Sequence, residues 1–155
     1  MAVAEIHKSV TIDAPAERVF DLLDDPSAIP SYTPSVERVE DVRQSEQRIG
    51  DTFRVIYKAV GMTFEEKFTV IEHNRPTRLA SRFENGMKGT FVYQVTAQGE
   101  QTALTVDVQY ELPGGPLGKA VDALLLERTN EKTIETQLDN LRQMAAQASI
   151  STSEA

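Results

Sequence analysis

The chain has 155 residues, of which 40% are hydrophobic and 26% charged, with a formal net charge of −8 and no cysteine. This length suits one domain with a real hydrophobic core, and no apolar run approaches the roughly 20 residues of a membrane span. Without cysteine the chain forms no disulfide, thiol nucleophile or thiolate metal site, and its negative charge disfavours nucleic acid as a partner. The first ten residues carry no basic segment followed by an apolar one, so we expect no secretory signal and a cytoplasmic location.

The first 42 residues predict a strand, two short helices and a second strand. β-Branched residues alternate along the first of these segments, which is typical of a strand. Pro15 follows a small side chain and shortly precedes an acidic one, as at the first turn of a helix. An Asp-Asp-Pro sequence then ends that helix. We therefore expect strands at residues 5–12 and 36–42, and helices at residues 15–23 and 27–32.

Residues 54–112 predict a row of antiparallel strands joined by hairpins. All eight glycines lie between the periodic segments, where they supply turn geometry. Folding the chain at these turns sets Tyr57 opposite Phe64, and Phe83 opposite Phe91. Because side chains alternate along a strand, eight of the ten aromatic residues then share one face, while charged residues occupy the other. The aromatic face carries Phe53, Tyr57, Phe64, Phe68, Phe83, Phe91, Tyr93 and Tyr110.

Residues 119–147 contain neither glycine nor proline and predict one long helix. Its apolar residues form two stripes that are rotated from each other, with the polar residues 127–133 between them. Either this polar middle is simply exposed, or it crosses a cavity that demands no apolar partner. The small polar residues 149–155 predict a disordered tail, so residues 1–148 form one predicted domain. The first stripe consists of Leu117, Val121, Leu124 and Leu125, and Arg128 continues it.

The stretch VTIDAPAERVFDLLDDPSAIPSYTPSVERVE, residues 10–40, resembles the opening of the START-like (SRPBCC) superfamily, in particular its polyketide cyclase/dehydrase and lipid-transport branch. The order of elements is similar over almost the whole chain. The resemblance implies an α+β helix-grip fold, in which a seven-stranded antiparallel sheet wraps a long C-terminal helix around an apolar cavity. It also implies an apolar ligand such as a lipid, polyketide or quinone, and cyclisation or aromatisation in some members. Tyr32 stands where the family usually has another aromatic residue, often tryptophan.

Glu66 is the main candidate for acid–base chemistry, because it lies among apolar residues on the aromatic face, close to Asn85 across the ladder. A carboxyl group in such surroundings has a raised pKa unless a cation or a donor meets it, and Arg128 is the candidate cation. Contact with water at the rim of the sheet explains Glu66 equally well. His7 and His73 lack the spacing of a metal site, so we expect no bound metal and no cofactor.

Three functions stay open at this point. The leading hypothesis is binding or carriage of a hydrophobic small molecule between the sheet and the long helix, although the aromatic face also suits a solidly packed core. The second hypothesis is a cyclase, aromatase or dehydratase that acts on a polyketide-like substrate, with Glu66 and a tyrosine as acid and base. The third is a protein-interaction module. The candidate ligand-binding residues are Tyr57, Phe64, Glu66, Phe68, Phe83, Phe91, Tyr93, Tyr110, Val121, Leu124 and Arg128.

Overall fold

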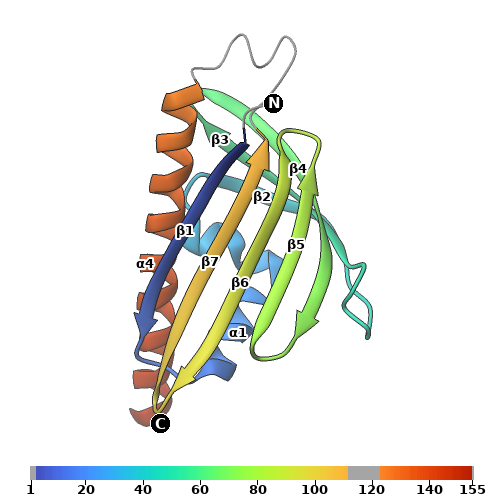
Figure 1. The fold of residues 1–155 in the computed structure, drawn as a ribbon. Helices are drawn as coiled ribbons and strands as arrows, with labels where there is room; N and C mark the ends of the chain where they lie inside the picture. The colour runs from blue at the N-terminus through green and yellow to red at the C-terminus, as the bar shows by residue number, and fades with distance from the viewer. Residues whose placement is uncertain (1–2, 112–122, 155) are drawn as a thin grey trace.

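A computed structural model describes residues 3–111 and 123–154 of the chain, with side chains described as far as residue 147. Its elements are β1 (Val3–Ile12), α1 (Ala16–Leu23), η1 (Pro26–Ala28), α2 (Ile29–Tyr32), β2 (Val36–Arg43), β3 (Thr52–Ala59), β4 (Met62–Asn74), β5 (Arg78–Glu84), β6 (Lys88–Gln98), β7 (Gln101–Glu111) and α4 (Ala123–Glu154). The strands form one antiparallel sheet in the order β1-β7-β6-β5-β4-β3-β2, with α4 running along it (Figure 1). The predicted sheet, the short helical segments after the first strand and the long C-terminal helix are confirmed.

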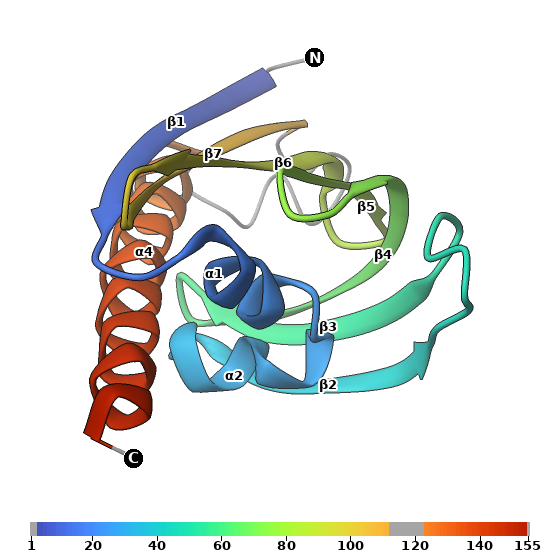
Figure 2. The same ribbon diagram turned by 90° about the horizontal axis from the view of Figure 1, so that it is seen from below.

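The sheet curves around its inner face, and the short helices α1 and α2 lie within this curve (Figure 2). Apolar side chains from the sheet, α1 and α4 meet in one hydrophobic cluster, in which Phe20, Leu104 and Leu141 are fully buried. Each such side chain contributes roughly 1.5–3 kcal/mol when it leaves water. Lys8 of β1 ties the sheet edge to α4, because its ammonium lies 2.7 Å from a carboxylate oxygen of Glu131.

The predicted strand pairing is confirmed in the first hairpins and wrong at one position. Tyr57 lies opposite Phe64, as expected, but Phe83 lies opposite Gly89 and not opposite Phe91. The β5–β6 turn is centred one residue earlier than predicted, because the backbone N–H groups of Gly86 and Met87 bond to the Glu66 carboxylate. Phe83 therefore pairs with a residue two positions before the predicted one. Because side chains alternate between the two faces of a strand, a shift of two residues leaves every side chain on its predicted face.

Gly89 lies inside strand β6, so the prediction that every glycine occupies a turn is wrong at this position. Its backbone approaches β7 very closely. A Cβ atom added at Gly89 would lie 2.0 Å from the carbonyl oxygen of Gln109 and 2.8 Å from the Cα of Tyr110. Only a residue without a side chain fits between these strands.

The α4 helix differs from its predicted bounds. The predicted start at residue 119 lies outside the described residues, and the helix extends to Glu154, through most of the predicted disordered tail. No glycine or proline occurs in residues 149–154, so nothing in the sequence ends the helix there. Leu126, Ile134 and Leu138 are buried along its inner side. Within residues 3–111 and 123–154, no helix is both long and apolar enough to span a membrane.

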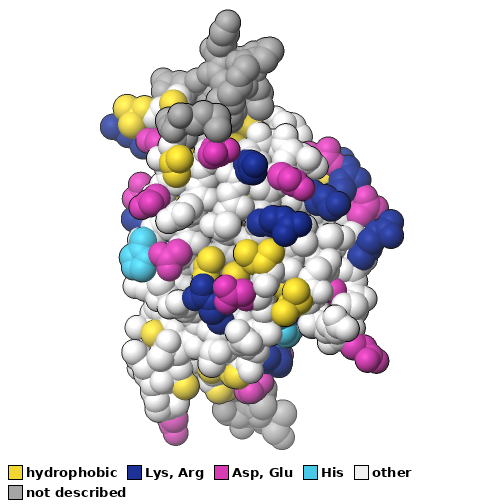
Figure 3. Space-filling view, turned by 45° about the vertical axis from the view of Figure 1, so that its right-hand side comes forward, with side chains coloured by type: hydrophobic (Ala, Val, Ile, Leu, Met, Phe, Trp, Pro, Cys, Tyr) yellow, Lys and Arg dark blue, Asp and Glu magenta, His cyan; other side chains and the backbone are white. Residues whose placement is uncertain are grey.

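The outer face of the sheet carries charged side chains of both signs, interspersed with one another (Figure 3). Arg54 of β3, for example, forms ion pairs with Asp41 and Glu65 on either side of it. Asn85, which the sequence placed on the inner face near Glu66, is exposed and adopts a positive φ of 101° in the β5–β6 turn. Exposed ion pairs contribute little to the free energy of unfolding. The charged side chains of this face therefore act mainly as a polar surface toward water.

Candidate ligand-binding cavity

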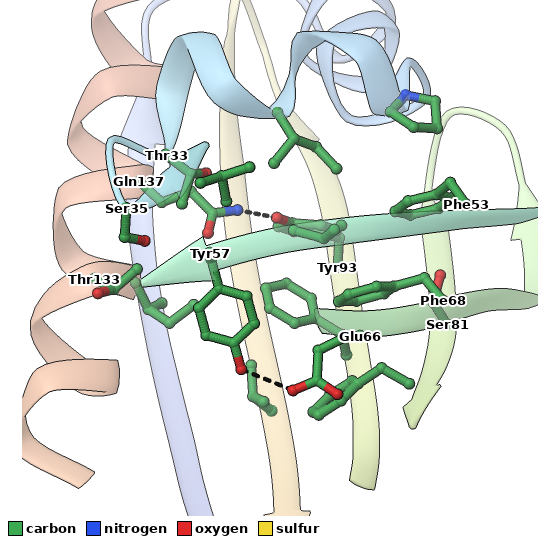
Figure 4. A pocket seen from close by; sticks show the side chains of 18 of the residues that line it. Thr33, Ser35, Phe53, Tyr57, Glu66, Phe68, Ser81, Tyr93, Thr133 and Gln137 are labelled. Atoms are coloured by element: carbon green, nitrogen blue, oxygen red, sulfur yellow. Dashed lines mark hydrogen bonds between the residues drawn. The ribbon is translucent and has the colours of Figure 1, made fainter. Parts of the chain in front are cut away.

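A cavity lies between the inner face of the sheet, the short helices and α4, and the close-up in Figure 4 shows residues from its wall. The centre of a water molecule can occupy a volume of about 170 Å³ in this cavity. The volume that a ligand can fill is larger, because each ligand atom extends beyond its own centre. Its wall is mainly apolar, and the α4 residues that face it are Asn130, Thr133, Ile134 and Gln137. The aromatic residues of the wall are Tyr32, Phe53, Tyr57, Phe68, Phe83, Phe91, Tyr93 and Tyr110.

Most of the residues that the sequence suggested as ligand-binding are brought together at this cavity. Strands β3 to β7 each contribute at least one of them, because their inner faces share the curve of the sheet. Val121 lies outside the described residues. The residues of the predicted set that line the cavity are Tyr57, Glu66, Phe68, Phe83, Phe91, Tyr93 and Tyr110.

Three residues of the predicted set, Phe64, Leu124 and Arg128, do not line the cavity. Phe64 is buried, but it stacks on Tyr57 with ring centres 5.4 Å apart, and Tyr57 takes the position facing the cavity. Leu124 is 56% exposed, near the start of the described part of α4. Arg128 is exposed because it precedes Gln137 by nine residues, or two and a half helical turns, which places it on the opposite side of the helix.

The polar middle of α4 faces the cavity in part, which favours the second of its two interpretations. Asn130 and Thr133 belong to this polar stretch and line the cavity. Gln137, which the sequence did not single out, donates a hydrogen bond to the Tyr93 hydroxyl within the wall (Figure 4). The interruption of the apolar stripe was the signal that could have identified Asn130 and Thr133, whereas Gln137 lies beyond it among the apolar residues of the second stripe.

Glu66 is the most buried charged residue of the wall, with 1% of its surface exposed. Its carboxylate accepts a hydrogen bond from the Tyr57 hydroxyl at 2.8 Å (Figure 4). It also accepts hydrogen bonds from the backbone N–H groups of Gly86 at 2.9 Å and Met87 at 2.9–3.0 Å. Glycine at position 86 leaves room for this approach, since a Cβ there would lie 2.7 Å from Oε2 of Glu66 and the carboxylate would have to shift. The β5–β6 turn therefore holds the carboxylate in a fixed place.

Burial raises the pKa of Glu66 from 4.5 to about 7, and the hydrogen bonds from Met87, Tyr57 and Gly86 offset only part of that effect. The same burial raises the pKa of the Tyr57 hydroxyl, which therefore stays protonated and acts as a donor. At neutral pH the Glu66 carboxyl group is close to half ionised. It can therefore accept or release a proton at a small free-energy cost. The predicted ion pair with Arg128 would instead have lowered the pKa of Glu66 and kept the carboxylate ionised.

The raised pKa of Glu66 predicts how stability depends on pH. Glu66 binds its proton more tightly in the folded protein, at a pKa of about 7, than at its ordinary value of 4.5 in the unfolded chain. Its contribution to stability is therefore complete below pH 4.5 and is lost as the pH rises through 7. Between pH 5 and pH 8 we expect the free energy of unfolding to fall by roughly 2–3 kcal/mol relative to Glu66→Gln, which does not titrate. Urea unfolding of both proteins at each pH measures this difference, and parallel curves would contradict it.

Two buried hydroxyl groups in the wall have no hydrogen-bond partner among the described residues. They are Oγ1 of Thr33 and the hydroxyl of Tyr110, which faces the Asn130 amide without a hydrogen bond of good geometry. Buried polar groups in proteins are nearly always paired with protein, water or ligand. These hydroxyls therefore supply free hydrogen-bonding capacity inside the cavity.

A charged cluster closes another part of the wall. Arg48 lies 2.8 Å from the Asp24 carboxylate and 2.7 Å from that of Asp51, while His73 Nε2 lies 2.9 Å from Asp24. The cluster joins the end of α1 to the β2–β3 connection and to β4. His73 is thus satisfied by Asp24, and within the described residues no group of three or more His, Asp or Glu side chains could hold a metal ion.

The chain is similar to known proteins in fold and in family. Solved structures that it resembles include a START superfamily protein from Mycobacterium smegmatis (18% identity, 93% of this chain and 98% of that one, TM-score 0.77). They also include the Zhui aromatase/cyclase from Streptomyces sp. R1128 (16%, 93% and 94%, TM-score 0.78) and a protein from Thermus thermophilus (22%, 94% and 99%, TM-score 0.76). At these identities the likeness concerns the fold, and it confirms the predicted START-like helix-grip architecture.

No curated protein shows significant sequence similarity to the chain. The sequence model of one family, described as polyketide cyclase / dehydrase and lipid transport, matches residues 3–146. That match spans all seven described strands and most of α4, including every described residue of the cavity wall. The chain therefore belongs to the polyketide cyclase / dehydrase and lipid transport family.

Proposed function

We propose that the protein binds a hydrophobic small molecule in the cavity between the sheet and α4. The observation that carries this proposal is an apolar cavity with eight aromatic residues in its wall, at the centre of a chain of only 155 residues. Interiors are normally packed without such space, because an empty apolar cavity forfeits contacts that its lining atoms would otherwise make. A ligand restores those contacts.

The physical driving force is burial of the ligand's apolar surface, at about 25 cal/mol per Å². Entropic costs of association consume part of this gain, so a rigid aromatic ligand benefits most. The two unpaired hydroxyls of Thr33 and Tyr110 can form hydrogen bonds with the ligand. These bonds orient the ligand but add little to the free energy of binding. Family membership supports the same conclusion, since the family includes lipid-transport proteins.

Titration of the purified protein with 2-naphthylethanol, a neutral and fluorescent aromatic alcohol, tests the proposal. We expect saturable binding of one molecule per chain, with a dissociation constant in the micromolar range and a rise in the fluorescence anisotropy of the probe. Native mass spectrometry gives the stoichiometry independently. Failure to saturate, together with no retained mass for this probe or for added lipids and quinones, would contradict the proposal.

One observation favours a second candidate function, proton transfer to or from a bound substrate. The Glu66 carboxyl group has a pKa of about 7 and lies 2.8 Å from the Tyr57 hydroxyl, both in the cavity wall. A general acid or base works best when its pKa lies near the working pH. If the protein turns over a polyketide-like substrate, Glu66→Gln should abolish turnover while the binding of 2-naphthylethanol survives. Undiminished turnover in that variant would remove Glu66 from the chemistry.

A further inference from the structure

The charged side chains in the cavity wall are unequally paired. The wall contains Asp24, Arg48, Lys58 and Glu66. Asp24 and Arg48 neutralise each other at 2.8 Å, and Lys58 lies 3.2 Å from Glu37 on the outer side. Glu66 forms no ion pair with any described residue, although it is almost completely buried. It is the one charged group of the described wall without a counter-charge.

Within residues 3–111 and 123–147, the donors that hold Glu66 are all neutral. They are one phenol and two backbone amides, which leave part of the carboxylate's capacity for hydrogen bonds unused. Among the described residues, no titratable cation faces it from the packed elements: β3 contributes Tyr57, β7 contributes Tyr110, and the cavity side of α4 is uncharged. A buried carboxylate with three neutral donors remains short of a positive charge.

Aromatic rings surround the same position. Phe68 follows Glu66 by two residues on the same face of β4, and its ring centre lies 5.3 Å from that of Phe83 and 6.4 Å from that of Phe91. The faces of such rings attract cations, and a desolvated ammonium gains most from them. A carboxylate among aromatic rings, in a protein of net charge −8, favours a cation over an anion or a neutral group.

We propose that the ligand of this cavity is an aromatic or otherwise apolar amine, whose ammonium group Glu66 binds as its counter-ion beside the Tyr57 hydroxyl. The apolar body of the ligand lies against the aromatic wall, and the unpaired hydroxyls of Thr33 and Tyr110 accept or donate further hydrogen bonds. This inference rests on the proposed function and specifies the chemistry of the ligand at the same site.

Three probes with one naphthyl body separate the inference from the proposed function. They are 2-naphthylethylamine, which is an ammonium ion at neutral pH, the neutral 2-naphthylethanol, and the anionic 2-naphthylacetate. At pH 8 we expect the ammonium to bind about tenfold more tightly than the alcohol, and the carboxylate to bind most weakly. Equal or tighter binding of the alcohol would overturn the inference while the proposed function stands, whereas binding of no probe would remove both.

Two variants at neighbouring positions show whether Glu66 is responsible. Glu66→Gln keeps an acceptor for the backbone donors and should abolish the preference, so that the ammonium and the alcohol bind this variant with affinities within about twofold of each other. Glu65→Gln makes the same change on the outer face of the sheet, where Glu65 pairs with Arg54, and should keep the preference. An unchanged preference in Glu66→Gln, or a loss in Glu65→Gln, would overturn the assignment.

Proton release by the unsubstituted protein gives a test that does not depend on the folding of a variant. Binding of an ammonium ionises the Glu66 carboxyl group, so its affinity should rise about tenfold from pH 6 to pH 8 as the fraction of ionised Glu66 rises. At pH 7, calorimetry in buffers of different ionisation enthalpy should show release of about half a proton per amine bound. No proton release and a flat pH profile would overturn the inference.

Discussion

Ser81→Phe is expected to weaken the binding of 2-naphthylethanol at least a hundredfold, while the protein stays folded. Ser81 is buried on the inner face of β5, lines the cavity, and lies opposite Val70 and Phe91 on the neighbouring strands. A phenyl ring at this position enters the empty space and takes the volume that the ligand requires. Because the space is already present, the added ring displaces little protein, and the cost of overpacking should be small. Fluorescence titration measures the affinity, and circular dichroism the fold.

Ser9→Phe provides the matched control for this variant. Ser9 is exposed on β1, so the same change adds an aromatic ring outside the cavity, and affinity should stay within about twofold of the original. Equal loss of binding in both variants would point to a general effect on the fold. Full binding in a folded Ser81→Phe protein would mean that the ligand lies elsewhere.

Gly89→Ala is the second change with a large expected effect, in this case on stability. The added Cβ would lie 2.0 Å from the Gln109 carbonyl oxygen, and this atom belongs to the backbone of the neighbouring strand, which cannot move without breaking the β6–β7 ladder. We expect the free energy of unfolding to fall by about 3 kcal/mol or more, within the range seen for severe steric strain. Urea denaturation followed by circular dichroism measures the loss.

Gly99→Ala separates this clash from the general effect of replacing glycine. Gly99 has a positive φ of 65° but open space around its Cβ position, so alanine there should cost only about 1 kcal/mol. A loss of unfolding free energy in Gly89→Ala that is no larger than the loss in Gly99→Ala would contradict the close approach of β6 and β7 at Gly89.

The fold could be predicted from the sequence because its signals are local. The proline and the acidic residue at the start of α1 are enough to predict that helix. Two-residue alternation is likewise enough to predict each strand of a hairpin. The error at Phe83 arose where a long-range bond decides the outcome, since Glu66 holds the β5–β6 turn through the Gly86 and Met87 amides. No local pattern reveals that a side chain twenty residues earlier replaces a turn's own hydrogen bonds.

The site could be predicted on the sheet and much less well on the helix. Alternation assigns a side chain to one of two faces, and the inner face of a curved sheet faces the cavity almost by necessity. A helix presents a continuous range of directions, so the rotation of α4 about its axis depends on its packing against the sheet. That rotation turns Asn130 and Gln137 inward and leaves Leu124 and Arg128 exposed, contrary to the predicted stripe.

A crystal structure of the protein with 2-naphthylethanol tests the binding proposal most directly. The proposal predicts one naphthyl ring between the sheet and α4, in contact with Phe68 and Phe91, with its hydroxyl near Glu66, Thr33 or Tyr110. Density for the probe only on the outer surface would contradict it. So would an unoccupied cavity whose aromatic side chains have closed on α4.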